Sequence, residues 1–188
     1  MTTPVSYTAT DRMGTIVIDS PPVNALSQTV RQGIIECLKV AEADDTEIVI
    51  LRCEGRTFIA GADITEFGKP PQAPALATVL EALESHPKPV MSAIHGTALG
   101  GGLELALCCD YRLATATARV GLPEVNLGLL PGAGGTQRLP RLTDLKTAID
   151  MITSGRPLNA SDAQVAGILD AVSDDDLAQA ATDFAGEL

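Results

Sequence analysis

The sequence has very few aromatic residues. They make up 3% of its 188 residues, and tryptophan is absent. A core built without them must rest on Leu, Ile, Val and Ala, which are plentiful enough to bring the hydrophobic share to 45%. Charged residues contribute 20%, a balance typical of folded globular proteins. The length suits one domain that can bury a sizeable core, and we expect a single domain over residues 1–188.

Positive charge is also scarce. The chain has 13 Lys and Arg residues against 24 Asp and Glu residues, which gives a formal net charge of −11. Proteins that bind nucleic acid need a basic surface, so we expect no nucleic-acid partner. Any anionic ligand must be held by local hydrogen-bond donors, because the overall field of the protein repels it.

Several sequence features that would assign a compartment or a metal are missing. No apolar run approaches the roughly 20 residues of a membrane span, and the N-terminus lacks the basic and apolar regions of a signal peptide. Cys37, Cys53, Cys108 and Cys109 form no CxxC pair and no Cys/His ligand spacing. We therefore expect reduced, buried thiols in a cytoplasmic protein, with no membrane contact and no metal.

Hydrophobic periodicity alternates between strand and helix patterns along the chain, which predicts an α/β fold. Residues 5–19 read as a hairpin with its turn at 11–14. A helix follows Ser27, its predicted cap, and buries apolar residues at helical spacing. The other predicted strands lie at 47–54, 90–96 and 111–115, and the other helices at 75–86, 144–155, 161–170 (capped by Ser161) and within 173–188.

The segment "HGTALGGGLELALCCD", residues 95–110, places three consecutive glycines after a predicted strand and before an apolar run. Glycines let the backbone approach a ligand closely, and a helix that begins there directs unpaired N–H groups at it. Such a site suits a phosphate or a developing oxyanion. The segment lacks the Walker Lys-Ser/Thr pair and the GxGxxG spacing, which disfavours a nucleotide site.

Two acidic residues accompany these glycines. Glu104 lies just inside the predicted helix, and Glu124 follows in the apolar loop "GLPEVNLG". Neither has charged neighbours in sequence, so a solvated surface explains them poorly. Two carboxyl groups that converge on a dry pocket titrate apart, and one can act as general acid and the other as general base. A second turn of small residues ends at Asp63, which is expected to cap the next segment.

Three segments together resemble the crotonase superfamily of enoyl-CoA hydratases and isomerases: "FIAGADITEF", "KPVMSAIHGTALGGGLELALCCDYRLAT" and "GLPEVNLGLLPGAGGTQRLPRL". The "PPVNAL" loop and the third segment are most similar to hydratase domains at the N-terminus of multifunctional fatty-acid oxidation enzymes. The resemblance covers nearly the whole chain. It implies a crotonase-like fold of repeated ββα units and the hydration of a trans-2-enoyl-CoA in fatty-acid β-oxidation.

The resemblance also implies roles for individual residues. The backbone N–H groups of Ala62 and Gly101 would bind the thioester oxygen. Glu104 would activate water, and Glu124 would exchange the proton at C2. Coenzyme A is part of the substrate, so no separate cofactor is implied. The matching positions near bound coenzyme A are Ala25, Leu26, Ala60, Asp63 and Ile64.

The sequence departs from the family in two respects. It stops before the usual C-terminal helices, so we expect a truncated domain that forms a homotrimer or hexamer or belongs to a larger multifunctional chain. It also has no obvious cationic cluster for the phosphates of coenzyme A. The isolated cations that could bind these phosphates are Arg52, Arg56 and Lys69.

Two alternatives to hydration follow from the same residues. A Δ3-Δ2-enoyl-CoA isomerase needs one acid/base and no bound water. A non-catalytic acyl-CoA-binding or assembly module needs the pocket alone. A serine hydrolase is disfavoured, because the chain has no GxSxG motif and His86 and His95 are expected to be structural.

Overall fold

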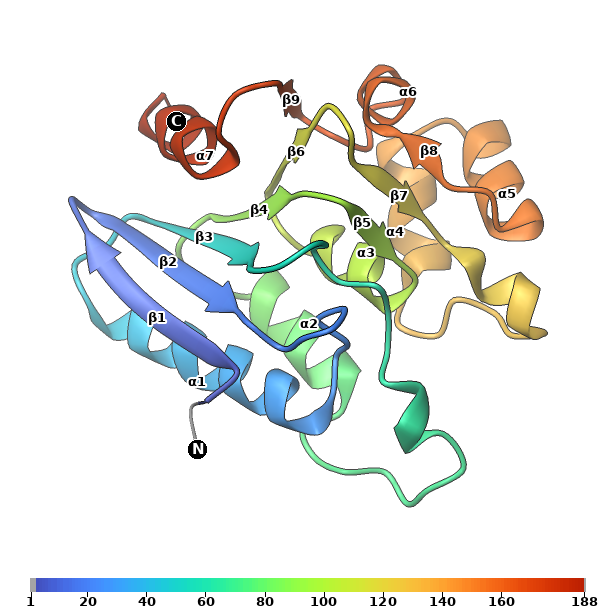
Figure 1. Cartoon of the computed structure of the whole chain (residues 1–188), viewed down its shortest axis with the longest axis horizontal. Helices are drawn as coiled ribbons and strands as arrows, with labels where there is room; N and C mark the ends of the chain where they lie inside the picture. The colour runs from blue at the N-terminus through green and yellow to red at the C-terminus, as the bar shows by residue number, and fades with distance from the viewer. Residues whose placement is uncertain (1–2, 188) are drawn as a thin grey trace.

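A computed structural model describes residues 3–187 and contains two β-sheets (Figure 1). The larger sheet has six strands in the order β1-β2-β3-β4-β6-β9, and only the β1–β2 pair is antiparallel. The predicted α/β class is confirmed. The strands are β1 (Val5–Thr10), β2 (Met13–Ile18), β3 (Ile48–Cys53), β4 (Val90–Ile94), β6 (Tyr111–Thr115) and β9 (Ala171–Ser173).

The smaller sheet contains β5 (Thr97–Leu99), β7 (Arg119–Gly121) and β8 (Leu158–Asn159), in the order β5-β7-β8. The strands predicted from the sequence include none of these three, nor β9, because runs of two or three residues carry no readable periodicity. β5 follows β4 and β7 follows β6, so the chain twice passes from the large sheet to the small one before a helix. This confirms the predicted repetition of ββα units.

Seven α-helices and two 3₁₀ helices connect these strands within the described residues. The helix predicted over 161–170 differs in two details. It spans only Ala160–Val165, as α6, and Asn159, not Ser161, caps it, since the Asn159 side chain accepts a hydrogen bond of 2.8 Å from the N–H of Asp162. The helices are α1 (Gln28–Ala43), η1 (Ile64–Glu66), α2 (Leu76–Glu84), α3 (Gly101–Ala106), η2 (Pro123–Leu127), α4 (Gly135–Leu142), α5 (Leu145–Ser154), α6 (Ala160–Val165) and α7 (Leu177–Gly186). None of them is both long and apolar enough to cross a lipid bilayer.

Alternate residues of the central strands enter two cores on opposite faces of the large sheet. On β3, Val49 and Leu51 join the main core with α1, α2 and α3, whereas Ile48 and Ile50 pack on the α7 side. Figure 1 shows α1 and α2 below the sheet and α7 above it. This period of two is what a strand buried on both faces requires. The glycine-rich ends of β4 and β5 are thereby held against a rigid core.

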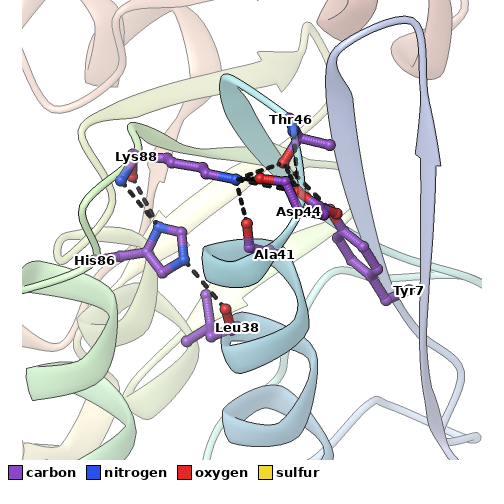
Figure 2. Close-up of polar contacts among 7 residues, drawn as sticks. All are labelled: Tyr7, Leu38, Ala41, Asp44, Thr46, His86 and Lys88. Atoms are coloured by element: carbon purple, nitrogen blue, oxygen red, sulfur yellow. Dashed lines mark hydrogen bonds and ion pairs between the residues drawn. The ribbon is translucent and has the colours of Figure 1, made fainter.

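The C-terminal end of α1 is held by side chains from two other segments, β1 and residues 86–88 (Figure 2). The Lys88 ammonium donates to the Asp44 carbonyl at 2.7 Å and pairs with its carboxylate at 3.1 Å. His86 Nε2 lies 3.2 Å from the Leu38 carbonyl, and the Tyr7 hydroxyl donates to Asp44 at 2.6 Å. A cation at a helix C-terminus satisfies unpaired carbonyls and complements the helix dipole. His86 therefore has a structural role, as the sequence predicted.

The four cysteines are all buried and free of disulfides, as predicted. Burial raises the pKa of Cys37 to about 11 and those of Cys108 and Cys109 to about 12. Because the thiolate is the reactive form, such thiols are inert near neutral pH. They serve as small apolar side chains in the core.

Candidate active site

A cavity of about 410 Å³ lies where α3, η1, α2 and η2 meet. Most of its lining is apolar or glycine, and Glu104 and Glu124 are the only carboxylates among the described residues that line it. The structure therefore brings together the two acids that the sequence separates by twenty positions. The lining residues are Ala60, Gly61, Ala62, Ile64, Phe67, Leu76, Ala77, Gly100, Gly101, Glu104, Pro123, Glu124, Leu127, Leu129, Leu130, Gly132 and Ala133.

The glycine triplet shapes one wall of this cavity. Gly100 has φ +52° and ψ −125°, a backbone conformation that only glycine adopts readily. Gly102 packs so closely on Ile59 that an added Cβ would lie 2.8 Å from the Ile59 Cβ. These two positions turn the chain sharply and let α3 begin directly at the cavity, with Gly101 as its first residue.

The two residues predicted to supply the oxyanion donors both line this cavity. The N–H of Gly101 belongs to the first turn of α3, where no carbonyl of the helix can accept it. A Cβ built on Gly101 would lie 3.6 Å from the Ala62 nitrogen, so the two residues are neighbours in space. Ala62 is placed by Leu26, which pairs with it in a parallel bridge and donates to the Gly61 carbonyl at 3.0 Å.

A buried arginine, which was not among the residues singled out from the sequence, holds the loop that contains Ala62. Arg31 is 7% exposed; its guanidinium donates to the Leu26 carbonyl at 2.7 Å and pairs with Glu66 of η1 at 2.9 Å. It also donates to the Pro74 carbonyl at 2.7 Å. The sequence does carry a signal for it: Arg31 follows Val30 on the apolar face of the predicted helix, where a charged residue is unusual. A buried charge requires partners, and these partners tie the Ala62 loop to α1.

Glu104 is only 2% exposed, and main-chain groups hold its carboxylate. Its Oε1 atom accepts hydrogen bonds of 2.8 Å from the N–H groups of both Ala133 and Gly135. Gly135 is the first residue of α4, so the positive end of that helix also faces the carboxylate. The sequence places Glu104 in the first turn of α3, but the hydrogen-bond donors to its carboxylate come from the start of α4.

Glu124 has the opposite environment. It lies in the first turn of η2 and is half-buried, and its Oε2 atom has no hydrogen-bond partner among the described residues. Burial raises the pKa of Glu124 above its ordinary value, and the nearby charge of Glu104 adds to the rise. A raised pKa lets a carboxyl group keep its proton to higher pH than an exposed glutamate does, which suits a general acid. The two acids of one cavity are thus differentiated by their surroundings.

The raised pKa of Glu124 has a consequence for stability. Between the unfolded and folded pKa values of this group the folded protein binds more protons, so its free energy of unfolding falls as pH rises through that interval. We expect Glu124→Gln to raise the melting temperature at pH 7, because the amide carries no charge to desolvate. The gain should disappear below the ordinary glutamate pKa, where the unfolded wild type is protonated too.

Thermal unfolding at pH 7 and pH 4 measures this difference, with Glu42→Gln as the exposed control. An equal or lower melting temperature for Glu124→Gln at pH 7, relative to wild type, would contradict the assigned environment of Glu124.

Most of the predicted coenzyme A positions line a second hollow of about 470 Å³. Ala25, Ala60, Asp63 and Ile64 contribute to it, and Ala60, Ala62 and Ile64 also line the first cavity. Leu26 is different: its side chain is buried and does not line the hollow, and its backbone pairs with Ala62. Because they share Ala60, Ala62 and Ile64, the cavity and the second hollow adjoin. A ligand could therefore extend through both, with its thioester where they meet.

Two of the charged residues proposed from the sequence have structural partners instead. Asp63 caps η1 by accepting from the N–H of Thr65 at 2.9 Å, and the hydrogen bonds from Thr65 lower the pKa of Asp63. Arg52 pairs with Glu54 at 2.6 Å. Lys69 lines an adjoining groove and stays a candidate to bind the phosphates of coenzyme A. Within residues 3–187 no cluster of His, Cys, Asp and Glu is arranged to hold a metal ion.

Comparison with known proteins assigns the chain to a family. The model of the enoyl-CoA hydratase/isomerase family matches residues 9–188. The chain belongs to this family. The sequence resemblance to the crotonase superfamily is thereby confirmed, and so is the crotonase-like fold.

The relatives of this family member differ greatly in length. The human peroxisomal bifunctional enzyme is 51% identical over 173 residues, which are 90% of this chain and 24% of that protein. A probable enoyl-CoA hydratase from Bacillus subtilis is 42% identical, over 88% of this chain and 67% of its own length. The crystal structure of enoyl-CoA hydratase from Bacillus anthracis superposes with a TM-score of 0.90 at 35% identity. That match covers 98% of this chain and 76% of the other.

Proposed function

We propose that the chain is an enoyl-CoA hydratase, which adds water to a trans-2-enoyl-CoA and yields the 3-hydroxyacyl-CoA. The observation that carries the proposal is one apolar cavity that combines two unlike carboxyl groups with two main-chain donors, Ala62 and Gly101. The names of the enoyl-CoA hydratases and bifunctional enzymes among its relatives support it.

The donors act on the thioester oxygen. As water adds to C3, negative charge develops on that oxygen in an enolate-like transition state. The N–H groups of Ala62 and Gly101 are fixed by the Leu26 bridge and by the start of α3, so no reorganisation is needed when the charge appears. Preorganised donors of this kind stabilise the transition state more than the ground state.

The two glutamates move the protons. Glu104, held through Oε1, orients the water and accepts its proton as the bond from oxygen to C3 forms. Glu124, with its raised pKa, delivers a proton to C2. The substrate thus gains OH at C3 and H at C2, and proton exchange with solvent returns both carboxyl groups to their starting forms.

Isomerisation is the second candidate activity. Glu124 lines the cavity, and its Oε2 atom has no hydrogen-bond partner among residues 3–187. One such carboxyl group can shuttle a proton between C2 and C4. An enoyl-CoA isomerase/hydratase from Mycosarcoma maydis, 41% identical over 175 residues, supports this dual activity. A 3-enoyl-CoA substrate distinguishes the isomerase from a pure hydratase.

The direct test is turnover of crotonyl-CoA by this chain, followed as loss of the absorbance of the conjugated thioester. We expect hydration that saturates with substrate. If the protein binds crotonyl-CoA without turnover, the proposal is replaced by the remaining alternative, a non-catalytic acyl-CoA-binding or assembly module. Calorimetric titration with crotonyl-CoA measures that binding.

Assembly and compartment belong to the proposal as well. We infer a homotrimer or hexamer, or a place within a larger multifunctional chain. Side chains exposed at the cavity mouth, such as Leu130 at 77%, would gain cover from such contacts, and the matched bifunctional enzymes are far longer than this chain. Light scattering of the purified protein measures the oligomer. The cytoplasmic location stays a prediction, because the human relative is named for the peroxisome and that from Cucumis sativus for the glyoxysome.

A further inference from the structure

The two hydrogen-bond donors of Glu104 flank one peptide group. The N–H of Ala133 and the N–H of Gly135 both point at Oε1, at 2.8 Å each. Between them lies the peptide that joins Ala133 to Gly134. Because a peptide group is planar, the orientation of its carbonyl governs how the flanking N–H groups converge. Whatever holds the Ala133 carbonyl therefore controls the geometry at Glu104.

Arg138 holds that carbonyl. Its Nη1 atom donates to the Ala133 oxygen at 2.8 Å. The Nη1 end of the guanidinium lies so close to the turn that a Cβ on Gly134 would collide with it, and Gly134 has φ +98°. The turn and the arginine are thus fitted to each other.

The guanidinium is itself fixed from the opposite side. Its Nε and Nη2 atoms donate to the two carboxylate oxygens of Glu84 at 2.6 and 2.7 Å. Glu84 is the last residue of α2, whereas Arg138 lies on α4. A bidentate pair of this kind restricts the planar guanidinium to one orientation. Both side chains approach the surface, so the ion pair alone adds little stability.

We propose that Arg138 is a positioning residue for Glu104, oriented by Glu84 and acting through the Ala133 carbonyl. Arg138 does not line the cavity, so it does not touch the substrate. It keeps the Ala133–Gly134 peptide in the orientation that points both flanking N–H groups at the carboxylate. The expected effect of Arg138 on catalysis rests on the proposed hydratase function, whereas its expected effect on the geometry around Glu104 does not.

Amide hydrogen exchange measured by NMR tests the structural part. In Arg138→Met the amides of Ala133 and Gly135 should exchange at least about tenfold faster, because their acceptor geometry is no longer held. Arg141→Met is the matched control: Arg141 lies on the same helix, is exposed and, among the described residues, its side chain bonds only to the Gln137 carbonyl. Unchanged protection of both amides in folded Arg138→Met overturns the proposal.

Two milder variants serve if Arg138→Met does not fold. Arg138→Lys keeps the charge but cannot bind Glu84 through two donors while also reaching the Ala133 carbonyl. Glu84→Gln leaves the arginine in place without its anionic partner. Each should speed exchange at Ala133 and Gly135 by a smaller factor than the methionine variant. If both variants protect these amides as wild type does, the proposal fails.

Kinetics test the catalytic part. Misplacement of a catalytic group costs up to about 100-fold in rate, so we expect Arg138→Met to lose about 10- to 100-fold in kcat on crotonyl-CoA. KM should change by less than about twofold, because no substrate contact is removed. A loss confined to KM, with kcat unchanged, contradicts a positioning role.

The two readouts separate this inference from the proposed function. If wild type fails to hydrate crotonyl-CoA while Arg138→Met still loses amide protection at Ala133 and Gly135, the function is wrong and the positioning stands. If wild type is active and Arg138→Met matches it in both exchange and kcat, the positioning is wrong and the function stands.

Discussion

Glu104→Gln and Glu124→Gln should each lower the rate of crotonyl-CoA hydration by about 10²–10⁴, the usual worth of general acid–base catalysis. Both variants should keep the fold. In Glu104→Gln the side-chain amide oxygen can still accept the hydrogen bonds from Ala133 and Gly135, and the unpartnered Oε2 of Glu124 gives up no bond. The measurement is the initial rate of absorbance loss at saturating crotonyl-CoA, with melting temperatures recorded for each variant.

Glu42→Gln is the control for this experiment, because Glu42 is exposed on α1 and does not line the cavity. It should retain the wild-type rate. A Glu104 or Glu124 variant that hydrates crotonyl-CoA as fast as this control would remove that glutamate from the mechanism.

Gly101→Pro should reduce hydration by at least about 10²–10³, the loss typical when one oxyanion donor is removed. Gly101 is the first residue of α3, the helical position where proline is best tolerated. The substitution therefore removes the N–H without breaking the helix. Its nearest side-chain neighbours, the flexible ends of Leu76 and Leu26, would lie 3.3 and 3.4 Å from a Cβ at this position.

Gly101→Ala is the matched control, since it adds the Cβ and keeps the N–H. We expect it to retain most of the activity, and circular dichroism should show both variants folded. A folded Gly101→Pro protein with the rate of Gly101→Ala would eliminate the proposed oxyanion site.

The sequence by itself determined the features that depend on neighbours along the chain. The hairpin of β1 and β2 and the start of α1 at Ser27 were predicted correctly, because alternation and capping are local patterns. The buried face of α1 was predicted for the same reason. The glycine triplet with Glu104 was singled out because both features are unusual within one short segment. The family followed from three long motifs in order, and the match over residues 9–188 confirmed it.

Only the tertiary structure decided what depends on distant residues. β5 and β7 are too short to show a period, and they exist because they pair with each other. The donors to Glu104 lie 29 and 31 positions away from it, and Glu84 lies 54 positions from Arg138. Arg138 reads in sequence as one more surface cation. Hydrogen bonds between such remote groups form only after the chain has folded, so no local pattern in the sequence could predict them.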